Sequence, residues 1–219
     1  MRRFVAGRSV PCGTAQRDGQ TYAEMILRSE RCTLRPYRPG DANWLPNLAN
    51  DVEVARWTSA SFPYPYTQYD ADAWVALASS ERPTNSFVIE AHGRPAGGIG
   101  LRPQSGEGHG VAECGYWLGR PFWGRGLATE ALCLLLPYAF AERRLRRLEA
   151  YVFATNPVSA RVLEKCGFVR EGVLREAVTD REGAIVDAWL YSRLQHDPTL
   201  KSGTVLARAV DAGPSGGNR

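Results

Sequence analysis

The chain has 219 residues, of which 44% are hydrophobic and 23% charged, and its formal net charge at pH 7 is +4. Because a domain commonly takes roughly 150 residues, this length suits one domain with appended segments, and the composition excludes wholesale disorder, collagen-like repeats and disulfide-stapled small folds. No apolar run approaches the roughly 20 residues that cross a membrane. Of 27 basic residues only Lys165 and Lys201 are lysines. This bias is more typical of codon usage than of an electrostatic stripe, so we expect neither nucleic acid nor membrane as a partner.

The cysteines are odd in number and include no C-x-x-C pair, which argues against a disulfide framework and against a thiolate zinc site. The histidines are scattered, so no metal site is expected. Free thiols are typical of a reducing compartment, and the start of the chain lacks the apolar stretch of a secretory signal, so we expect a cytoplasmic protein. The five cysteines are Cys12, Cys32, Cys114, Cys133 and Cys166.

The two ends of the chain carry few fold signals. We expect residues 1–28 to be a poorly ordered N-terminal extension, with Met25 as an alternative start because it leads directly into the first periodic segment. The extension has an arginine-rich start, so an organelle transit peptide stays open as an alternative. Residues 197–219 are rich in Gly, Ser and Pro and are typical of a flexible tail, which leaves 29–196 as the domain.

In the first half of this domain, hydrophobic patterns and turn residues predict short helices and antiparallel strands. Asp41 and either Thr67 or Asp70 are candidate N-caps of helices. The segment 62–67 (FPYPYT) cannot be helical, because each proline biases its predecessor toward extended geometry. The expected elements are a strand at 31–35, helices at 41–50, at 51–57 and from about residue 68 to 80, a hairpin of strands 86–91 and 95–101, and a strand at 111–118.

The second half begins with a helix. Apolar residues at helical spacing predict a buried helix over 126–142. Pro137 interrupts it, and since an interior proline removes a hydrogen-bond donor, we expect a kink near Cys133 or an early end there. The residues of its buried face are Leu127, Ala131, Leu134, Leu135 and Tyr138. The remaining elements are a strand at 147–154, a helix at 156–165 closed by Gly167, and strands at 168–174 and 184–194. This mixture indicates a single α/β or α+β domain.

The most informative stretch is 116–130 (YWLGRPFWGRGLATE), where a strand runs into a glycine-rich turn and then a helix. The start of a helix presents unpaired backbone N–H groups and the positive end of the helix dipole, which together bind phosphate. Gly124 and Gly126 allow the tight turn and a close approach, and Arg125 adds a cation. The turn is therefore a candidate phosphate site.

Two alternatives compete with phosphate binding at this turn, and a third is excluded. The first is a helix start without any ligand. The second is a dinucleotide-binding turn, and with it a nicotinamide enzyme. It would need G-x-G-x-x-G and an acid at the end of the next strand, whereas Thr129 stands where the third glycine belongs and Glu149 lies at the beginning of that strand. A Walker loop is excluded because no G-K-[ST] follows.

The chain carries three motifs in order along the sequence: FPYPYT at 62–67, WGRGLATEA at 123–131 and NPVSARVLEKCGF at 156–168. In this order they resemble the RimJ/RimL-like branch of the GNAT superfamily of N-acetyltransferases. Residues 123–131 (WGRGLATEA) are similar to the loop with which that family holds the pyrophosphate of acyl-coenzyme A. The segment 62–67 is similar to an aromatic and proline-rich segment of that branch, and 156–168 (NPVSARVLEKCGF) resembles its helix with Asn, Ser and a terminal Gly-Phe. The resemblance spans 31–194. It implies a mixed, mostly antiparallel central sheet, flanked by helices and splayed to admit acetyl-CoA.

The resemblance also implies how acetyl-CoA would lie. Its pyrophosphate would contact the helix start, its pantetheine would pair with the end of strand 111–118 as an added strand, and the thioester would lie beside Gly115. Asn156 is expected to meet the pantetheine amides, or only to cap its helix, and Arg161 to meet a phosphate, or only solvent. The cofactor-binding residues expected are Tyr116, Trp117, Leu118, Gly124, Arg125, Gly126, Leu127, Ala128, Thr129, Asn156 and Arg161.

Direct attack of an amine on the thioester needs a base for the amine and an acid for the departing thiolate. Glu113, upstream of the loop on the same strand, is the candidate base, and a surface or ion-paired glutamate is the alternative. Many GNAT enzymes place a tyrosine where Leu163 stands here, so that role cannot be carried over. Ser159 is the candidate acid, with a cap or a cofactor contact as the alternative. Tyr64 and Tyr66 are candidates to line the acceptor site.

The sequence is therefore interpreted as an N-acetyltransferase that moves acetyl from acetyl-CoA to a primary amine, without a metal. The amine is either the α-amine of a protein N-terminus or a primary amine of a small molecule. A non-catalytic acyl-CoA-binding or regulatory module is the alternative. No acidic cluster of the kind that binds polycations is visible, which disfavours aminoglycosides and polyamines as acceptors. A monomer or a homodimer is expected.

Overall fold

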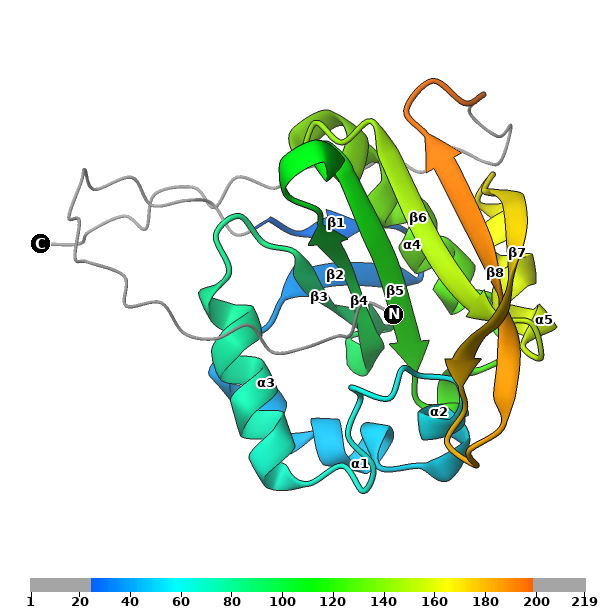
Figure 1. Ribbon diagram of the computed structural model, residues 1–219. Coiled ribbons are helices and arrows are strands. Elements are labelled where there is room, and N and C mark those ends of the chain that lie inside the picture. The colour runs from blue at the N-terminus through cyan, green and yellow to red at the C-terminus, as the bar shows by residue number, and fades with distance from the viewer. Residues whose placement is uncertain (1–24, 199–219) are drawn as a thin grey trace, which may run out of the picture.

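The computed structural model describes residues 25–198, so 1–24 and 199–219, which belong to the predicted extension and tail, lie outside the described residues. The described chain forms one eight-stranded sheet with helices on both faces (Figure 1). No helix in this range is long and apolar enough to span a bilayer. The strands are β1 (Leu27–Arg28), β2 (Cys32–Pro36), β3 (Ser86–Ala91), β4 (Arg94–Pro103), β5 (Val111–Leu118), β6 (Arg147–Phe153), β7 (Val169–Thr179) and β8 (Ile185–Leu194). The α-helices are α1 (Leu45–Ala49), α2 (Val52–Arg56), α3 (Gln68–Ser80), α4 (Leu127–Pro137) and α5 (Pro157–Lys165).

The strand order of the sheet is β1-β2-β3-β4-β5-β6-β8-β7. Every neighbouring pair is antiparallel except β5 and β6, which run parallel. Parallel neighbours need a crossover connection, and α4 lies in the connection between these two strands. The mixed, mostly antiparallel sheet implied by the resemblance is confirmed.

The parallel pair is short and leaves the middle of the sheet open. Beyond the paired residues both strands continue, and Figure 1 shows them diverging. The sheet is therefore splayed between β5 and β6, and β5 has an open edge after Glu113. The paired residues are Val111↔Arg147, Ala112↔Leu148 and Glu113↔Glu149.

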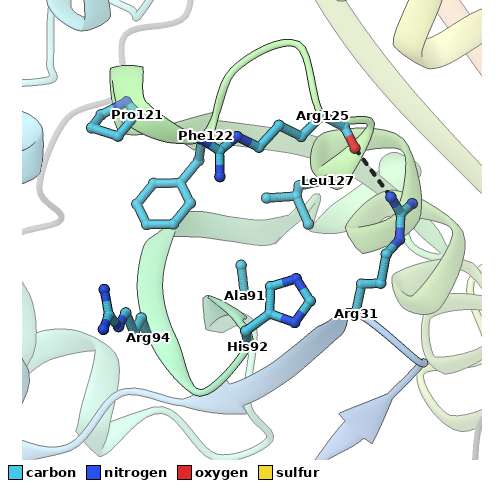
Figure 2. A pocket seen from close by; sticks show the side chains of 8 residues that line it. All are labelled: Arg31, Ala91, His92, Arg94, Pro121, Phe122, Arg125 and Leu127. Atoms are coloured by element: carbon cyan, nitrogen blue, oxygen red, sulfur yellow. Dashed lines mark hydrogen bonds between the residues drawn. The ribbon is translucent and has the colours of Figure 1, made fainter.

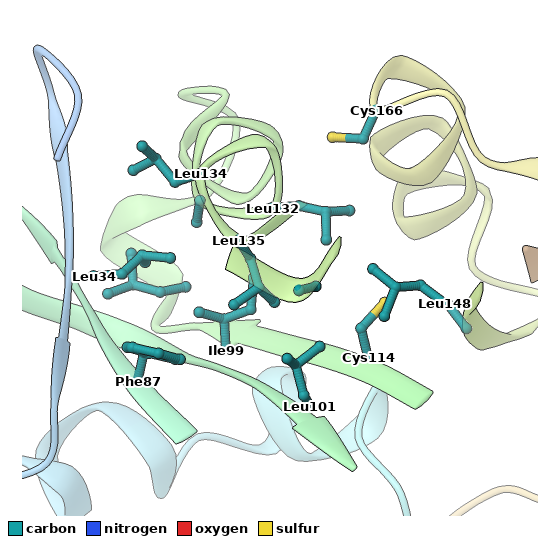
Figure 3. Packing of buried hydrophobic residues seen from close by; sticks show 14 of the residues in the cluster. Leu34, Phe87, Ile99, Leu101, Cys114, Leu132, Leu134, Leu135, Leu148 and Cys166 are labelled. Atoms are coloured by element: carbon teal, nitrogen blue, oxygen red, sulfur yellow. The ribbon is translucent and has the colours of Figure 1, made fainter. Parts of the chain in front are cut away.

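The face of the sheet that carries α4 and α5 buries the larger apolar core (Figure 3). The five apolar residues predicted on the buried face of the helix over 126–142 are all buried, together with Leu132. Four of them lie in α4, and Tyr138 follows its end. Full burial of a leucine contributes about 1.5–3 kcal/mol. On the opposite face α1 and α3 pack over a smaller cluster that includes Tyr37, Tyr66 and Val75. The sheet is thus held between two helical layers.

The prediction of a kink near Cys133 is wrong. The helix α4 stays α-helical to Pro137, and a wider π-helical turn follows over Tyr138–Glu142, where Arg143 N–H donates to the carbonyl of Tyr138 at 2.9 Å. A proline lacks the N–H that would bond one turn back. Because buried leucines hold the preceding turn against the sheet, the irregularity follows the proline instead of preceding it.

The helix expected over 41–50 also differs. Asp41 does not cap a helix but lies in a 3₁₀ turn, Pro39–Asn43, and α1 begins only at Leu45. The buried carboxylate of Asp41 accepts two hydrogen bonds from Arg35, at 2.7 and 2.8 Å. Although burial opposes it, these bonds hold the pKa of Asp41 below its ordinary value. A charge-assisted, bidentate contact with β2 therefore outweighs the local capping signal.

One of the alternative predicted caps of α3 is observed, the start of α2 has a cap that was not predicted, and one boundary moves. Asp51 caps α2, and Thr67 caps α3 in a reciprocal capping box with Asp70. The strand Leu27–Arg28, which lies in the predicted 1–28 extension, pairs with β2, and Leu27 is buried. The sheet therefore begins before residue 29.

Candidate functional site

The glycine-rich turn between β5 and α4 leaves backbone N–H groups open. Gly124 and Gly126 have φ of 72° and 76°, a left-handed conformation that glycine adopts without steric cost. Gly126 is the N-cap residue of α4, and no side chain caps the helix. A Cβ at Gly124 would meet nothing within 4 Å. The first amides of α4 therefore face outward with the positive end of the helix dipole.

The other residues expected in this loop differ in what they expose. Arg125 is exposed, whereas Leu127 is buried in the core, so only the backbone of Leu127 can reach a ligand. Ala128 and Thr129 are half-buried. The structure therefore brings 124–129 together as one surface that consists mainly of peptide groups and one cation.

Glu130, in the first turn of α4, is bound by the turn between β1 and β2. Its carboxylate accepts from Ser29 Oγ at 2.5 Å and from Arg31 Nη2 at 2.6 Å, and Arg31 Nη1 donates to the carbonyl of Arg125 at 3.4 Å. Although partial burial opposes it, these contacts of the carboxylate lower the pKa of Glu130. The ion pair with Arg31 neutralises an acid that would otherwise repel an anion at the loop. Sequence reasoning missed this arrangement.

A cavity of about 610 Å³ adjoins the loop. Figure 2 shows it between the turn of the β3–β4 hairpin and the start of α4. Arginines line it from three separate elements, so its surface suits an anionic ligand. The lining residues are Arg31, Ala91, His92, Arg94, Pro121, Phe122, Arg125 and Leu127.

The open edge of β5 presents the peptide groups of Tyr116 and Leu118. Gly119 N–H donates to the carbonyl of Ala96 at 2.9 Å, and along an antiparallel strand every second residue bonds to the same neighbour. The peptide groups of Tyr116 and Leu118 are therefore directed away from β4, toward the side where pairing with β6 has ended. The carbonyl of Leu118 accepts from Trp123 Nε1 at 2.7 Å. The N–H of Leu118 and both groups of Tyr116 remain for a ligand.

Gly115 and Trp117 alternate with these residues. A Cβ at Gly115 would meet nothing within 4 Å, so the strand is open there to close approach. The Trp117 ring packs toward the α1 and α3 layer, with centroid distances of 6.4 Å to Trp44 and 5.5 Å to Phe62. The peptide groups of Trp117 are directed to β4, so they are not available at the open edge of β5. Its ring lies on the face of the sheet that α1 and α3 cover.

The phenol of Tyr116 reaches α5. Its hydroxyl lies 3.0 Å from Ser159 Oγ and donates to the carbonyl of Ser159 at 3.2 Å. Asn156 caps the same helix by accepting from Ser159 N–H at 3.1 Å. Burial raises the pKa of Tyr116, so the phenol stays protonated at neutral pH. The structure therefore joins two predicted residues, Asn156 and Ser159, to a hydroxyl that sequence reasoning did not single out.

Glu113 is the last residue of β5 that pairs with β6, so it lies at the vertex of the splay. Arg102 forms an ion pair with its carboxylate. On β6 the neighbouring Glu149 accepts from Arg147 Nε at 2.8 Å, and Arg147 also binds Glu171 of β7 at 2.5 Å. The carboxylates beside the vertex are thus paired with arginines, as one of the two alternatives for Glu113 anticipated.

The remaining predicted residues lie in different settings. Tyr64 is 45% exposed, whereas Tyr66 is 5% exposed and packs on Phe62, with 5.2 Å between ring centroids. Burial raises the pKa of Tyr66 to about 12. Tyr66 is therefore a core residue and does not line an accessible site, in contrast to the expectation. Arg161 is exposed on α5.

Arg181, in the turn between β7 and β8, is a contact that the sequence did not predict. Its Nε donates to the carbonyl of Ala55 at 2.6 Å, and its Nη2 donates to those of Ser59, at 3.1 Å, and Phe62. These bonds fasten the β7–β8 hairpin to the segment whose Phe62 packs on Trp117. The partners lie more than 100 residues away in sequence, so no local pattern signals them.

The chain is similar to known proteins over the region that contains this site. The acetyltransferase (GNAT) domain family matches residues 31–169, which include the glycine-rich turn and β5. The uncharacterised N-acetyltransferase p20 of Bacillus licheniformis is 32% identical over 177 residues, 78% of this chain and 97% of that protein. Spermidine N(1)-acetyltransferase of Escherichia coli K12 is 29% identical over 147 residues, 64% of this chain and 74% of that protein. Mycobacterium smegmatis RimJ, solved with CoA-disulfide, superposes with a TM-score of 0.69 at 26% identity over 79% of this chain and 87% of that one.

Proposed function

Because this chain belongs to the GNAT family of N-acetyltransferases, which use acetyl-CoA, we propose that it acetylates a primary amine, either the α-amine of a protein N-terminus or an amine of a small molecule, by direct transfer. The observation that carries this proposal is the meeting of two open features. The uncapped start of α4, with its two glycines, suits a diphosphate. The open edge of β5 beside it suits an extended chain of amides.

Acetyl-CoA supplies the acetyl thioester, and the chain's own residues would hold it. The amides of 124–129 would bind the diphosphate, with Arg125 adding positive charge. Tyr116 and Leu118 would pair with the amides of the pantetheine. The exposed Arg161 on α5 suits a phosphate contact, and Asn156 keeps the first turn of α5 in place through its cap. The fit rests on the uncapped first turn of α4 and on the peptide groups at the open edge of β5.

The acceptor amine must lose a proton before it attacks. At pH 7 this costs about 1.4 kcal/mol for an α-amine with a pKa near 8 and about 4.6 kcal/mol for a lysine amine near 10.4. We assign Glu113 as the base, acting directly or through a water, because it lies at the vertex where β5 leaves β6. Arg102 holds its carboxylate in place. A single ion-paired carboxylate is a modest base, so it suits an α-amine, whose deprotonation costs less than that of a lysine amine.

The departing thiolate needs a proton, and Ser159 is the proposed donor. Its hydroxyl contacts the phenol of Tyr116, which stays protonated and can return the proton that Ser159 gives up. Cys114 is buried, and burial raises the pKa of its thiol to about 12. A protonated thiol in the core is a poor nucleophile, which supports direct transfer over an acetyl-cysteine intermediate.

The charge around the vertex supports an α-amine over a polyamine as acceptor. Glu113, Glu149 and Glu171 are paired with Arg102 and Arg147, so they offer little net negative charge to a molecule with several ammonium groups. The stacked tryptophans and Phe62 add an apolar surface on the same side of β5. A singly charged amine with an apolar neighbouring group suits this combination.

An acceptor panel tests the proposal. Acetyl-CoA is combined with peptides that differ in their first residue, with the same peptides blocked at the N-terminus but carrying a lysine, and with spermidine, and the released thiol of CoA is measured. We expect turnover with free N-termini, none with the blocked peptides, and at least tenfold lower kcat/KM with spermidine. Turnover with spermidine alone would contradict an α-amine as the acceptor and would indicate a polyamine instead. Binding of acetyl-CoA without turnover of any amine would favour the non-catalytic module.

The role of Glu113 has its own test. Glu113→Gln should lower kcat/KM at pH 7 about tenfold to a hundredfold and should lose less near pH 9, because more of an α-amine is then already neutral. Glu107→Gln, at an exposed position in the loop between β4 and β5, is the control and should change neither value. An unchanged rate at pH 7 at saturating acetyl-CoA would remove Glu113 as the base.

The free thiols indicate the cellular compartment in which the protein acts. The four cysteines of the described residues are free, which supports a reducing compartment, and we place the activity in the cytoplasm. In solution the protein is proposed to be a monomer or a homodimer. Size-exclusion chromatography with light scattering distinguishes these two states.

A further inference from the structure

Two cysteines that are far apart in sequence meet behind the candidate site. Cys133 lies in the middle of α4 and Cys166 at the end of α5, and their Sγ atoms are 3.3 Å apart. The Sγ of Cys166 also lies 3.4 Å from the carbonyl of Thr129, in the first turn of α4. The dithiol therefore joins the helix that begins at the glycine-rich turn to the helix that begins at Asn156.

The two thiols differ in reactivity, as a nucleophile and its resolving partner do. The hydrogen bond with Cys166 lowers the pKa of Cys133, burial opposes this, and the positive charge of Arg193 adds to the lowering. The buried Nε of Arg193 has no hydrogen-bond partner among the described residues. The same thiol contact, together with burial, raises the pKa of Cys166. Cys133 therefore has the greater thiolate character, with a protonated thiol beside it.

Access also separates Cys133 from the other thiols. Its side chain is half-buried and can be reached from solvent, whereas Cys32 and Cys114 are 2% and 4% exposed. Burial raises the pKa of each of these two thiols to about 12. Of the described cysteines, Cys133 alone combines access with thiolate character.

We propose that Cys133 and Cys166 form a redox-active pair, which a hydroperoxide closes to a disulfide that thiol reductants reopen. The thiolate of Cys133 attacks one oxygen of the hydroperoxide and the O–O bond breaks. A sulfenic acid forms, and the departing oxygen takes a proton from solvent and leaves as water when the oxidant is hydrogen peroxide, or as an alcohol when it is an organic hydroperoxide. The sulfur of Cys166 then attacks the sulfenic sulfur, its proton leaves with the hydroxyl as water, and the S–S bond forms. Two thiols lose two electrons and the peroxide gains them. The bond ties α4 to α5 and spares Cys133 further oxidation.

The test uses the full chain with Cys12→Ser, because Cys12 lies outside the described residues. The protein is treated with hydrogen peroxide, free thiols are alkylated, and peptides are mapped without reduction. We expect the peptide with residue 133 to be joined to the peptide with residue 166, the bond to reopen with dithiothreitol, and Cys32 and Cys114 to react at least tenfold more slowly. The oxidised protein should melt about 5 °C higher, since the bond constrains the unfolded chain.

The control variants make the result decisive. Cys133→Ser should abolish the cross-link, and Cys32→Ser should leave it intact. A stable sulfinic acid at Cys133, pairing with any other cysteine, or equal reaction of all four thiols would overturn the proposal. If Cys133→Ser fails to fold, the peptide map of the parent protein decides alone, because it identifies both partners of the bond.

Discussion

Ser159 and Tyr116 are 43 residues apart in sequence, yet their hydroxyls meet beside the open edge of β5. If Ser159 passes a proton to the departing thiolate, Ser159→Ala lowers kcat about tenfold to a hundredfold and leaves the KM for acetyl-CoA within about threefold. Steady-state kinetics with the preferred amine measures both constants. Val158→Ala, at an exposed position of the same helix, is the matched control. A kcat of Ser159→Ala equal to that of the parent would contradict the assignment.

Glu171 gives a prediction about acid stability. Hydrogen bonds from Arg147 and then Ser192 lower the pKa of Glu171 from 4.5 to about 2. Their stabilisation is therefore complete above pH 4.5 and is lost as the pH falls toward 2, because the unfolded chain takes up the proton first. Since this carboxylate is more than a third exposed, solvent screening limits the effect. Glu171→Gln should cost about 0.5–1 kcal/mol at pH 6 and almost nothing at pH 2.

Urea unfolding at the two pH values measures this difference. The parent and Glu171→Gln are compared with Glu176→Gln, whose residue is also exposed on β7, as the control. The free energy of unfolding of the control should follow that of the parent at both pH values. A cost for Glu171→Gln that is the same at pH 2 and pH 6 would show that the ion pair does not account for it.

At the scale of residues, the sequence predicts what depends on nearby positions. The left-handed glycines follow from the turn, and Asn156 follows from the capping preference at the start of α5. Glu130 and Arg181 were missed because their partners lie 99 to 126 residues away, and a single sequence holds no record of such contacts. The burial of Tyr66 was missed for a similar reason, since α3 and β3 are needed to cover it.

At the scale of elements, Arg181 makes the β7–β8 hairpin and the segment before α3 into one unit. Arg181→Ala removes the hydrogen bonds to three carbonyls, those of Ala55, Ser59 and Phe62, and we expect a loss of about 1–2 kcal/mol in the free energy of unfolding. Because Phe62 packs on Trp117, the KM for the amine should rise about threefold or more, while the KM for acetyl-CoA stays unchanged.

Kinetics with each substrate varied in turn separates these effects. Arg175→Ala, at an exposed position of β7, serves as the matched control and should alter neither constant. Equal rises in both KM values for Arg181→Ala would mean that the contact supports the fold in general and does not shape the acceptor side.

Elements with strong local signals were predicted well, and those shaped by distant charges were not. The helix α3 has a capping box at its start, and β5 was predicted with its observed bounds. The segment 41–50 was predicted as one helix because Asp41 is a good cap, but its carboxylate is bound by Arg35 instead. Pro137 was expected to disturb α4 earlier, but packing of the apolar face holds the helix to its end.

At the scale of the whole molecule, the splay depends on the order of the strands. Only the central pair is parallel, and its pairing ends at Glu113. Local patterns predicted the strands but not their order, since the pairing of distant strands leaves no periodic trace in one chain. The expectation of a splayed sheet came from the resemblance of three motifs, and the resemblance could not indicate how few residues pair.

Ligand binding by the whole molecule gives a further prediction. At a concentration 100 times its dissociation constant, acetyl-CoA should add about 2.7 kcal/mol to the free energy of unfolding. For a chain of this size the melting temperature should rise by about 5–10 °C. Thermal unfolding with acetyl-CoA and, as a control, with NAD measures the shift. A rise with NAD and none with acetyl-CoA would favour the dinucleotide alternative.

The central claim is that the backbone amides at the start of α4 hold a diphosphate. A crystal structure of the protein with coenzyme A tests it most directly. The predicted result is diphosphate oxygens within about 3.2 Å of N–H groups of residues 124–129, with the pantetheine along the open edge of β5. A diphosphate bound elsewhere, with these amides facing only solvent, would contradict it.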